Sequence, residues 1–431
     1  MIKPLAIFAA ACLAAFAGAK ANEVPEELIY DSSQFASWLS DFKAFARKRH
    51  KISQATLSAA FSGVKFQQKV IDADRRQPEF VKPFWSYYDS ALKPERVANG
   101  KVKLEEHAKL LEAAHRKYNV QPHVIVAFWG METNYGAYMG DLPVISSLAT
   151  LAYDLRRREF FTAELVEALK IIERGHMKPS EMKGSWAGAF GNFQFLPSVF
   201  NRHAVDGDGD GKIDIVKSVP DAVFSAANYL SKMGWNGRYR WGRPVSFPEG
   251  DLRVWAEVNS NEWKPLSLFR SLGVKSHNGR ELPAADIQAS LVAPSGAEGP
   301  VFVTYENFRR IMRWNASTSY ALAVGLLSDA IVAKSMDVFE RPSGWDKAAA
   351  TTTAQIMEIQ AALSRLGLYD AKVTGLYGRT TAKAIKDYQS MLLAGDKKVS
   401  GGGAVAKYKS GKAIIPDGYP SLDLYDTLVA K

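Results

Sequence analysis

Apolar side chains recur every three or four residues through the first half of the chain. Examples are Phe35, Trp38, Leu39, Phe42 and Phe45, and later Phe161, Leu165, Val166 and Leu169. This period is typical of helices with one buried face, because side chains three and four positions apart lie on the same side of an α-helix. We therefore expect residues 35–239 to be mainly helical.

The pattern changes between residues 245 and 305. Short apolar runs such as SLVA and VFVTY stand between Pro, Gly and Asn residues, as in short strands joined by turns. Helical spacing returns from Asn307 to about Phe339. The predicted fold is thus mainly α, with a helical core and a small β-containing lobe.

A second, smaller unit is expected at the C-terminus. Residues 340–353, ERPSGWDKAAATTT, lack periodicity and are predicted to be a linker. Residues 354–431 then carry helix signals at 355–366 and 380–392. We expect them to form a small helical module that is docked on the main domain or tethered to it.

The N-terminus is typical of a secretory signal. Residues 1–21, MIKPLAIFAAACLAAFAGAKA, combine Lys3, an apolar run and small residues before a cleavage point after Ala21. The run is shorter than the ~20 apolar residues that a spanning helix needs. We therefore predict an exported protein of the periplasm whose main domain covers residues 22–339. The alternative is a lipoprotein acylated at Cys12, but Ala9 to Ala11 lack the expected large aliphatic residue.

Cysteine content and charge narrow the function classes. Cys12 is the only cysteine, so the mature chain would have no disulfide, thiolate nucleophile or cysteine metal site. Losing Lys3 and Lys20 lowers the net charge from +10 to +8. A basic protein suits an anionic partner. For an exported protein, a cell-wall polymer is a better candidate than nucleic acid.

One acid, Glu132, lies in the apolar stretch FWGMETNYGAYMG (128–140). Helical spacing places it beside Phe128 and Trp129, and predicts Tyr135 on the same face. Burial on such a face should raise its pKa. A carboxylic acid that stays protonated near neutral pH can protonate the leaving oxygen of a glycosidic bond. The alternative role is a structural ion pair.

The stretch KGSWAGAFGNFQFLPSVF (183–200) places small residues between aromatic ones. Gly184, Gly188 and Gly191 allow a backbone or a ligand to approach closely. Ser185 and Gln194 offer hydrogen bonds to sugar hydroxyl or acetamide groups. The alternative is a tight helix junction stabilised by small residues.

The segment GMETNYG, followed some 50 residues later by GSWAGAFGNFQFLPS, resembles the lytic murein transglycosylase B family. DRRQPEF (74–80), SSLATLAYD (146–154) and RWNASTSYALAV (313–324) extend the resemblance over residues 61–332. It implies a lysozyme-like α-helical core with additional lobes and a single catalytic acid at Glu132. Trp314 replaces a tyrosine of some members, which keeps an aromatic platform but loses a hydroxyl. The glycan groove would be lined by Tyr87, Ser185, Gln194, Phe195, Tyr229, Trp314, Asn315 and Tyr320.

The resemblance also implies a reaction without a cofactor. Glu132 would protonate the oxygen between N-acetylmuramic acid and N-acetylglucosamine, and would then deprotonate the muramic 6-hydroxyl to close a 1,6-anhydro ring. No water is added, so no second catalytic carboxylate is needed. The nearest following acid, Asp141, is expected in a loop. The alternatives are a hydrolytic muramidase with a second acid and a non-catalytic wall-binding scaffold.

The segment DGDGDGKID (206–214) matches a calcium-loop template, in which alternate oxygens converge on one ion. Lys217 stands where the template has a bidentate acid. The resembled family carries a similar, irregular loop, and its downstream acid matches Asp221. We predict a structural Ca²⁺ site, against the alternative of a hydrated Asp/Gly turn. Its candidate residues are Asp206, Asp208, Asp210, Lys212 at position 7, Asp214 and Asp221.

The C-terminal module has a resemblance of its own. Residues 356–393 resemble the first type of peptidoglycan-binding domain, and PDGYPSLDLYDTL (416–428) is similar to its second half. Most matching positions are expected in its core, and Tyr377, Arg379 and Thr380 could contact a ligand. The implied partners are peptidoglycan glycan strands, and we predict no particular protein partner from the sequence.

Overall fold

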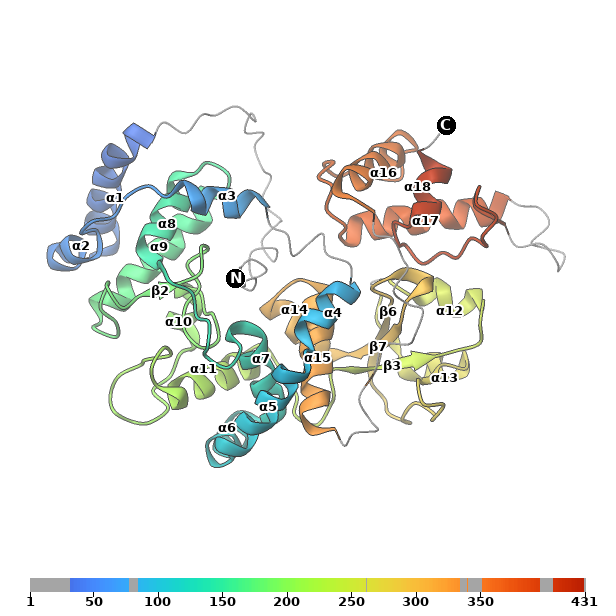
Figure 1. The fold of residues 1–431 in the computed structure, drawn as a ribbon, viewed down its shortest axis with the longest axis horizontal. Coiled ribbons are helices and arrows are strands. Elements are labelled where there is room, and N and C mark those ends of the chain that lie inside the picture. The colour runs from blue at the N-terminus through green and yellow to red at the C-terminus, as the bar shows by residue number, and fades with distance from the viewer. Residues whose placement is uncertain are drawn as a thin grey trace.

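The computed structural model describes residues 32–76, 84–260, 262–333, 339, 351–395 and 406–429. The predicted signal peptide (1–21), residues 340–350 of the predicted linker and residues 77–80 of the DRRQPEF motif lie outside the described residues. The described chain is mainly helical with one small sheet, so the predicted fold class is confirmed (Figure 1). None of its helices is both long enough and apolar enough to cross a membrane.

Two groups of helices build the larger part of the molecule (Figure 1). The N-terminal group consists of α1 (Phe35–His50), α2 (Gln54–Ala60), α3 (Gln68–Arg76), α8 (Val144–Tyr153) and α9 (Arg158–Glu173). The central group consists of α4 (Phe84–Ala91), α5 (Pro94–Glu106), α6 (Ala108–Tyr118), α7 (Pro122–Thr133), α10 (Pro197–His203), α11 (Val219–Lys232), α14 (Glu306–Trp314) and α15 (Thr318–Val332).

Helix α7 is the central element of the core and packs against α15, α5 and α6. It begins with Pro122, whose missing N–H costs little in the first helical turn. Every residue from Val124 to Thr133 is buried, as expected for a helix that is apolar on all sides. Asn134 ends it in the left-handed conformation (φ 50°).

The β lobe lies in the predicted region and contains a five-stranded antiparallel sheet of order β4-β6-β7-β3-β5. Short helices cover it, and Trp255, Leu266 and Phe269 are among the residues of its separate apolar core. Its elements are β3 (Gly242–Ser246), α12 (Leu252–Glu257), β4 (Lys264–Pro265), α13 (Leu266–Ser271), β5 (Lys275–Ser276), β6 (Gln288–Val292) and β7 (Val301–Tyr305). A second sheet pairs β1 (Leu142–Pro143) with β2 (Lys183–Gly184).

The predicted return of helical structure at Asn307 is observed, but the helical region is divided in two and its second helix ends before Phe339. The chain forms α14 and α15, separated at residues 315–317, and α15 ends at Val332. Asn315 adopts an extended conformation, and the Ser317 side chain accepts a hydrogen bond from the backbone N–H of Tyr320 and so begins α15. The break matters for the site, because it brings Trp314 and Tyr320 to the same side of α7.

The C-terminal module contains α16 (Thr353–Arg365), α17 (Arg379–Gly395) and α18 (Leu422–Leu428) around its own core. Thr352 and Gln355 form a capping box, so the last residues of the predicted linker belong to the module. The hydroxyl of Tyr377, a predicted ligand contact, donates to the carbonyl oxygen of Gly418 (3.0 Å) within the module.

The module is docked on the β lobe rather than merely tethered. The Lys386 ammonium donates hydrogen bonds to the carbonyl oxygens of Trp255 (3.1 Å), Ala256 (2.7 Å) and Val258 at the end of α12. A cation at this position is favourable, because the last carbonyl groups of a helix carry partial negative charge. The buried carboxylate of Asp417 also accepts from the backbone N–H of Ala297 (2.8 Å). These contacts fix the module beside the sheet.

Candidate active site

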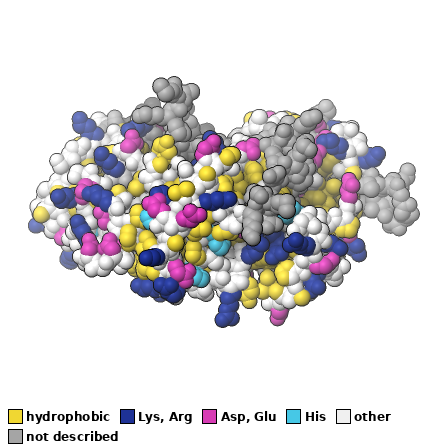
Figure 2. Space-filling model, turned by 60° about the horizontal axis from the view of Figure 1, so that its bottom comes forward, with side chains coloured by type: hydrophobic (Ala, Val, Ile, Leu, Met, Phe, Trp, Pro, Cys, Tyr) yellow, Lys and Arg dark blue, Asp and Glu magenta, His cyan; other side chains and the backbone are white. Residues whose placement is uncertain are grey.

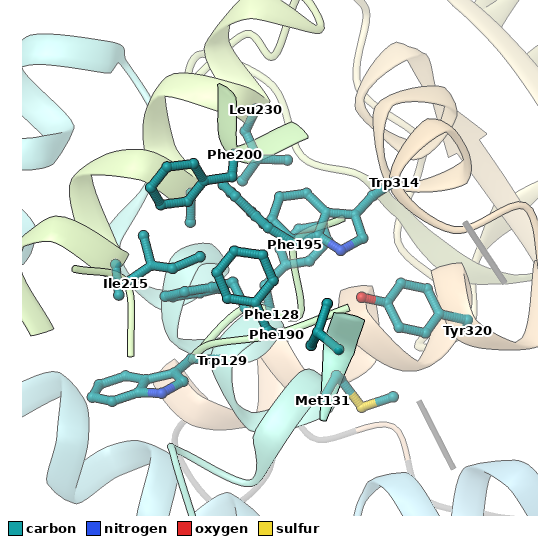
Figure 3. Packing of buried hydrophobic residues seen from close by; sticks show 14 of the residues in the cluster. Phe128, Trp129, Met131, Phe190, Phe195, Phe200, Ile215, Leu230, Trp314 and Tyr320 are labelled. Carbon is teal, nitrogen blue, oxygen red and sulfur yellow. The ribbon is translucent and has the colours of Figure 1, made fainter. Parts of the chain in front are cut away.

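Glu132 lies in the last turn of α7 with only 5% of its surface exposed. The Trp314 Nε1–H donates to Glu132 Oε1 (2.9 Å), and the Tyr320 hydroxyl donates a short hydrogen bond to the same oxygen. Figure 3 shows the Tyr320 hydroxyl and the Trp314 indole near the end of α7. Because both donors use Oε1, the proton of the neutral carboxyl group belongs on Oε2.

Burial raises the pKa of Glu132 to about 8, and the hydrogen bonds from Tyr320 and Trp314 offset part of that rise. Glu132 is therefore mostly protonated at neutral pH. No neighbouring carboxylate among the described residues contributes to this shift. Asp141 is exposed in the loop before β1, as predicted. The arrangement is that of one isolated acid and not of a carboxylate pair.

Aromatic rings pack together beside Trp314, which donates to the acid, and Figure 3 shows Phe128 and Phe195 next to its indole. The Trp314 ring centre lies 4.5 Å from that of Phe128, 5.0 Å from Tyr229 and 5.6 Å from Phe195. These tilted and edge-on arrangements are favourable for aromatic pairs. Predicted site residues from α11, α14 and the loop before α10 thus meet beside Glu132.

Several predicted groove residues use their polar atoms within the protein. Trp314 is 2% exposed and Tyr320 is fully buried, and both donate to Glu132. Asn315 is buried, and its Oδ1 accepts from the Ser317 N–H (3.0 Å). The structure therefore gives Trp314 and Tyr320 contacts that position the acid, and gives Asn315 a contact that shapes the break between α14 and α15.

Ser185 stabilises a turn within its own loop, and Gln194 joins that loop to the one after α7. The Ser185 hydroxyl accepts from the Ala189 N–H (3.2 Å), and Gln194 Nε2 donates to the carbonyl oxygens of Met139 (2.9 Å) and Gly191 (3.1 Å). A side chain at Gly184 would have its Cβ 2.0 Å from the Ala189 carbonyl oxygen, so only glycine fits this close approach. The loop after α7 is thereby tied to the loop that precedes α10.

Tyr87 is placed differently from the other candidates. It is buried on α4, and its charge interaction is with Arg96 of α5.

Tyr135 lies away from the predicted helix face, because α7 ends at Thr133 and Tyr135 has a positive φ of 62°. Its hydroxyl donates to the carbonyl oxygen of Arg96 (2.8 Å). The predicted contact between Tyr135 and Glu132 along the helix is therefore wrong.

Asn192 is a site residue that the sequence analysis missed. Its Oδ1 accepts from Trp129 Nε1 (2.9 Å), and its backbone carbonyl accepts from the Thr133 hydroxyl (2.7 Å). Its Nδ2 donates to the carbonyl oxygens of Ile215 and Val216 (3.0 Å each). This buried amide joins the end of α7 to the segment that follows the acidic loop. Its position between Gly191 and Phe193 in GNFQF was the available signal.

In the predicted calcium loop, Asp206, Asp208 and Asp210 each place one carboxylate oxygen within 4.8 Å of the others. The Asp206 carboxylate also accepts from the backbone N–H groups of Gly209 (2.6 Å) and Gly211 (2.8 Å), which shape the turn. Three converging carboxylates form the oxygen-only donor set that Ca²⁺ prefers.

The other candidate metal ligands have partners within the loop. Asp221 is buried and accepts from the N–H groups of Gly207 and Asp214 (2.7 Å each), so it braces both sides of the loop. Asp214 Oδ1 accepts from the Lys217 N–H (2.9 Å), and the Lys217 ammonium is 2.6 Å from Glu181. The Lys212 N–H donates to Asp210 Oδ1 (2.8 Å), and its carbonyl is the predicted donor at position 7.

Comparisons with known proteins agree with this arrangement. Residues 34–329 match the model of the transglycosylase SLT domain, and residues 352–392 match that of the putative peptidoglycan binding domain. The chain is 33% identical over 247 residues to the membrane-bound lytic murein transglycosylase B of Escherichia coli K12. That match covers 57% of this chain and 66% of the relative, slightly less than two thirds of its length.

Solved structures extend the similarity. SltB3 of Pseudomonas aeruginosa, in complex with NAG-anhNAM-pentapeptide, is 40% identical with a TM-score of 0.81, covering 91% of this chain and 99% of that one. Escherichia coli Slt35 in complex with calcium is 29% identical with a TM-score of 0.60, covering 68% and 92%. The buried acid, its aromatic surroundings and these matches lead to one conclusion: the chain belongs to the transglycosylase SLT domain family, in its lytic murein transglycosylase B branch.

Proposed function

We propose that this protein is a peptidoglycan lytic transglycosylase that cleaves the MurNAc-β-1,4-GlcNAc bond without water. The observation that carries the proposal is the buried carboxyl group of Glu132, which no other described carboxylate influences, which is mostly protonated at neutral pH and whose Oε2 accepts no hydrogen bond from a described residue. A reaction that adds no water needs one acid that becomes a base. It needs no second carboxylate.

The chemistry follows from that geometry. Glu132 Oε2 donates its proton to the bridging oxygen as the C1–O bond breaks, and the substrate's own acetamide stabilises C1. Trp314 and Tyr320 then stabilise the carboxylate that has formed, because hydrogen bonds to a charged oxygen are stronger than those to a neutral one. This carboxylate accepts the proton of the muramic 6-hydroxyl, whose oxygen bonds to C1. The product has a 1,6-anhydro end, and Glu132 is protonated again.

The relatives support this substrate class. The Pseudomonas SltB3 relative was solved with NAG-anhNAM-pentapeptide and with NAG-NAM-pentapeptide, which are an anhydro and a non-anhydro form of the same unit. The match of residues 352–392 to a putative peptidoglycan binding domain points to the same polymer.

Mass spectrometry of the fragments that the protein releases from intact peptidoglycan sacculi tests the proposal. We expect anhydromuramic ends, one water lighter than hydrolysed ends. Reducing ends would instead show a hydrolytic muramidase with a second carboxylate. Persistent binding without fragments would show a wall-binding scaffold.

We also propose the domain organisation and location. Residues 1–21 are a signal peptide, residues 22–339 the catalytic domain, residues 340–351 a connecting segment and residues 352–431 the peptidoglycan-binding module, which begins at the cap of α16. The protein then acts in the periplasm, and acylation at Cys12 is the alternative. The mass of the N-terminal peptide of the exported protein distinguishes cleavage after Ala21 from a lipid-modified Cys12.

Deleting residues 340–431 is expected to weaken binding to sacculi at least about tenfold, because a tethered binding module raises the local substrate concentration. Turnover of short glycans is expected to remain. Lys386→Met is the matched control: it disturbs docking on α12 but keeps the module attached, so sacculus binding should persist. Equal pull-down of the deletion variant and the full chain would contradict the prediction.

We propose that the loop of residues 206–214 binds a structural Ca²⁺, as the calcium complex of the Slt35 relative suggests. Chelation with EGTA should then lower the melting temperature by several degrees, since a ligand at about 100 times its Kd contributes about 2.7 kcal/mol. Asp210→Asn should abolish the calcium-dependent difference in differential scanning calorimetry. Identical melting with and without calcium would refute the site.

A further inference from the structure

A cavity of about 560 Å³ lies where the helical core meets the β lobe. Its lining comes from the start of α7, the end of α15, strand β3 and the segment around β5. His123, at the start of α7, is nine residues from Glu132, which is about 13 Å at the rise of an α-helix. The cavity is therefore separate from the candidate active site, and the function proposed above does not use it.

The acids of this cavity already have cationic partners. The Asp329 carboxylate lies 2.9 Å from the Arg240 guanidinium and also accepts from Trp241 Nε1 (3.1 Å). Glu281 lies 2.8 Å from the Lys275 ammonium. The charges within each pair cancel. The lining has two further arginines, Arg243, on which Asp329 acts at longer range, and Arg280, so it keeps an excess of positive charge.

Among the described residues, no carboxylate forms an ion pair within 4 Å of Arg243 or Arg280. Arg243 Nε is buried without a hydrogen-bond acceptor, although the guanidinium group lies close enough to the Tyr305 hydroxyl to interact with it, and its carbon is 5.9 Å from the centre of the Tyr305 ring. A buried donor without an acceptor is costly. Guanidinium groups bind carboxylates through two parallel hydrogen bonds. A ligand carboxylate would supply the missing acceptor.

The rest of the lining limits the size and charge of the ligand. Trp235, Tyr239 and Trp241 give the cavity aromatic surface for apolar groups. Burial and the nearby Arg240 lower the pKa of His123 to about 4, so its ring is neutral and adds no positive charge. Figure 2 shows one face of the molecule, on which Lys and Arg side chains lie beside histidine and hydrophobic side chains. The carboxylates of Asp329 and Glu281 would repel a highly charged ligand such as a polyphosphate. A small peptide with one or two carboxylates fits the lining better.

We propose that this cavity binds a carboxylate of a peptidoglycan peptide stem, with Arg243 and Arg280 as the recognising residues and the aromatic wall against its apolar side chains. The inference rests on the proposed function for the identity of the polymer. The cavity would be a second recognition site, which binds the peptide part of the polymer and not its sugars. Peptide-bearing strands should therefore bind more tightly than strands from which the peptides have been removed.

Isothermal titration of the full chain with the free stem pentapeptide tests this site. Arg243→Met is expected to weaken pentapeptide binding at least about tenfold, as for loss of a charge-assisted hydrogen bond. Arg243→Lys keeps the positive charge but cannot form two parallel hydrogen bonds to a carboxylate, so its affinity for the pentapeptide should be intermediate. Arg253→Met is the matched control: it removes the same charge from an exposed position on the same lobe, where Arg253 pairs with Asp251, and should leave binding unchanged. Equal pentapeptide affinity of Arg243→Met and the unaltered chain would overturn the proposal.

A second titration separates this inference from the proposed function. Peptide-free NAG-anhNAM should bind the Arg243→Met variant and the unaltered chain alike, and cleavage of peptide-free glycan should be unchanged. A pentapeptide whose carboxylates are amidated should bind at least about tenfold more weakly to the unaltered chain. If glycan cleavage fails while pentapeptide binding depends on Arg243, the proposed reaction is wrong and the peptide site stands. Equal affinity for the amidated and free pentapeptides would exclude carboxylate recognition.

Discussion

Glu132→Gln is expected to reduce glycan cleavage by about 10²- to 10⁴-fold, the contribution typical of general acid–base catalysis. Glutamine has the same shape and keeps an oxygen that can accept from Trp314 and Tyr320, so the aromatic surroundings should be preserved. It has no proton to donate to the bridging oxygen. The rate of anhydromuropeptide release from sacculi measures the effect, and binding of uncleavable glycan should be retained.

Glu164→Gln is the matched control for this substitution. Glu164 is also buried and burial also raises its pKa, but its carboxylate accepts from the N–H (2.9 Å) and hydroxyl (2.6 Å) of Ser198 at the start of α10. Its replacement should cost stability and leave most of the activity. Full activity in Glu132→Gln would remove Glu132 from the mechanism.

Glu132→Gln is also expected to change the stability of the protein. The unfolded Glu132 ionises near its usual pKa of 4.5, whereas the folded group stays protonated up to about pH 8. Its contribution to stability is therefore fully present below pH 4.5 and is lost as the pH rises to about 8. Glu132→Gln should have the same free energy of unfolding as the unaltered chain at pH 4 and a higher one at pH 8, by on the order of 4 kcal/mol.

Local patterns in the sequence were sufficient to predict the burial of Glu132 and the fold class. The apolar residues around Glu132 indicated burial, and the structure confirms that it is buried and has a raised pKa. The change of period near residue 245 indicated the β lobe, whose strands lie between Gly242 and Tyr305. Both features depend on neighbours within a few residues along the chain.

Contacts between distant segments were not predictable from spacing. Trp314 follows Glu132 by 182 positions, and no periodicity shows that its indole N–H would contact Oε1 and not a sugar. The same holds for the contact of Lys386 with the end of α12, which distinguishes a docked module from a tethered one. Asn192 was missed because its partners on α7 and beyond the acidic loop are also remote in sequence.

Tyr320→Phe is expected to shift the high-pH limb of kcat/KM upward by about one pH unit and to reduce kcat by about 10- to 100-fold. The acid is active while Glu132 is protonated, so activity falls as the pH rises through a pKa of about 8. The Tyr320 hydroxyl stabilises the carboxylate and lowers this pKa, so its loss must raise it. The rate falls because the carboxylate formed after proton transfer loses one of its two donors.

Tyr135→Phe provides the control, because it removes a hydroxyl near the same end of α7 that donates to the Arg96 carbonyl and not to Glu132. It should leave the high-pH limb in place. Trp314→Phe, which removes the other donor to Oε1, should move the limb in the same direction as Tyr320→Phe. A loosened core would lower kcat in these variants without raising the apparent pKa. If the apparent pKa of the high-pH limb is unchanged or lower in Tyr320→Phe, Tyr320 supports the packing of the site and does not set the acidity of Glu132.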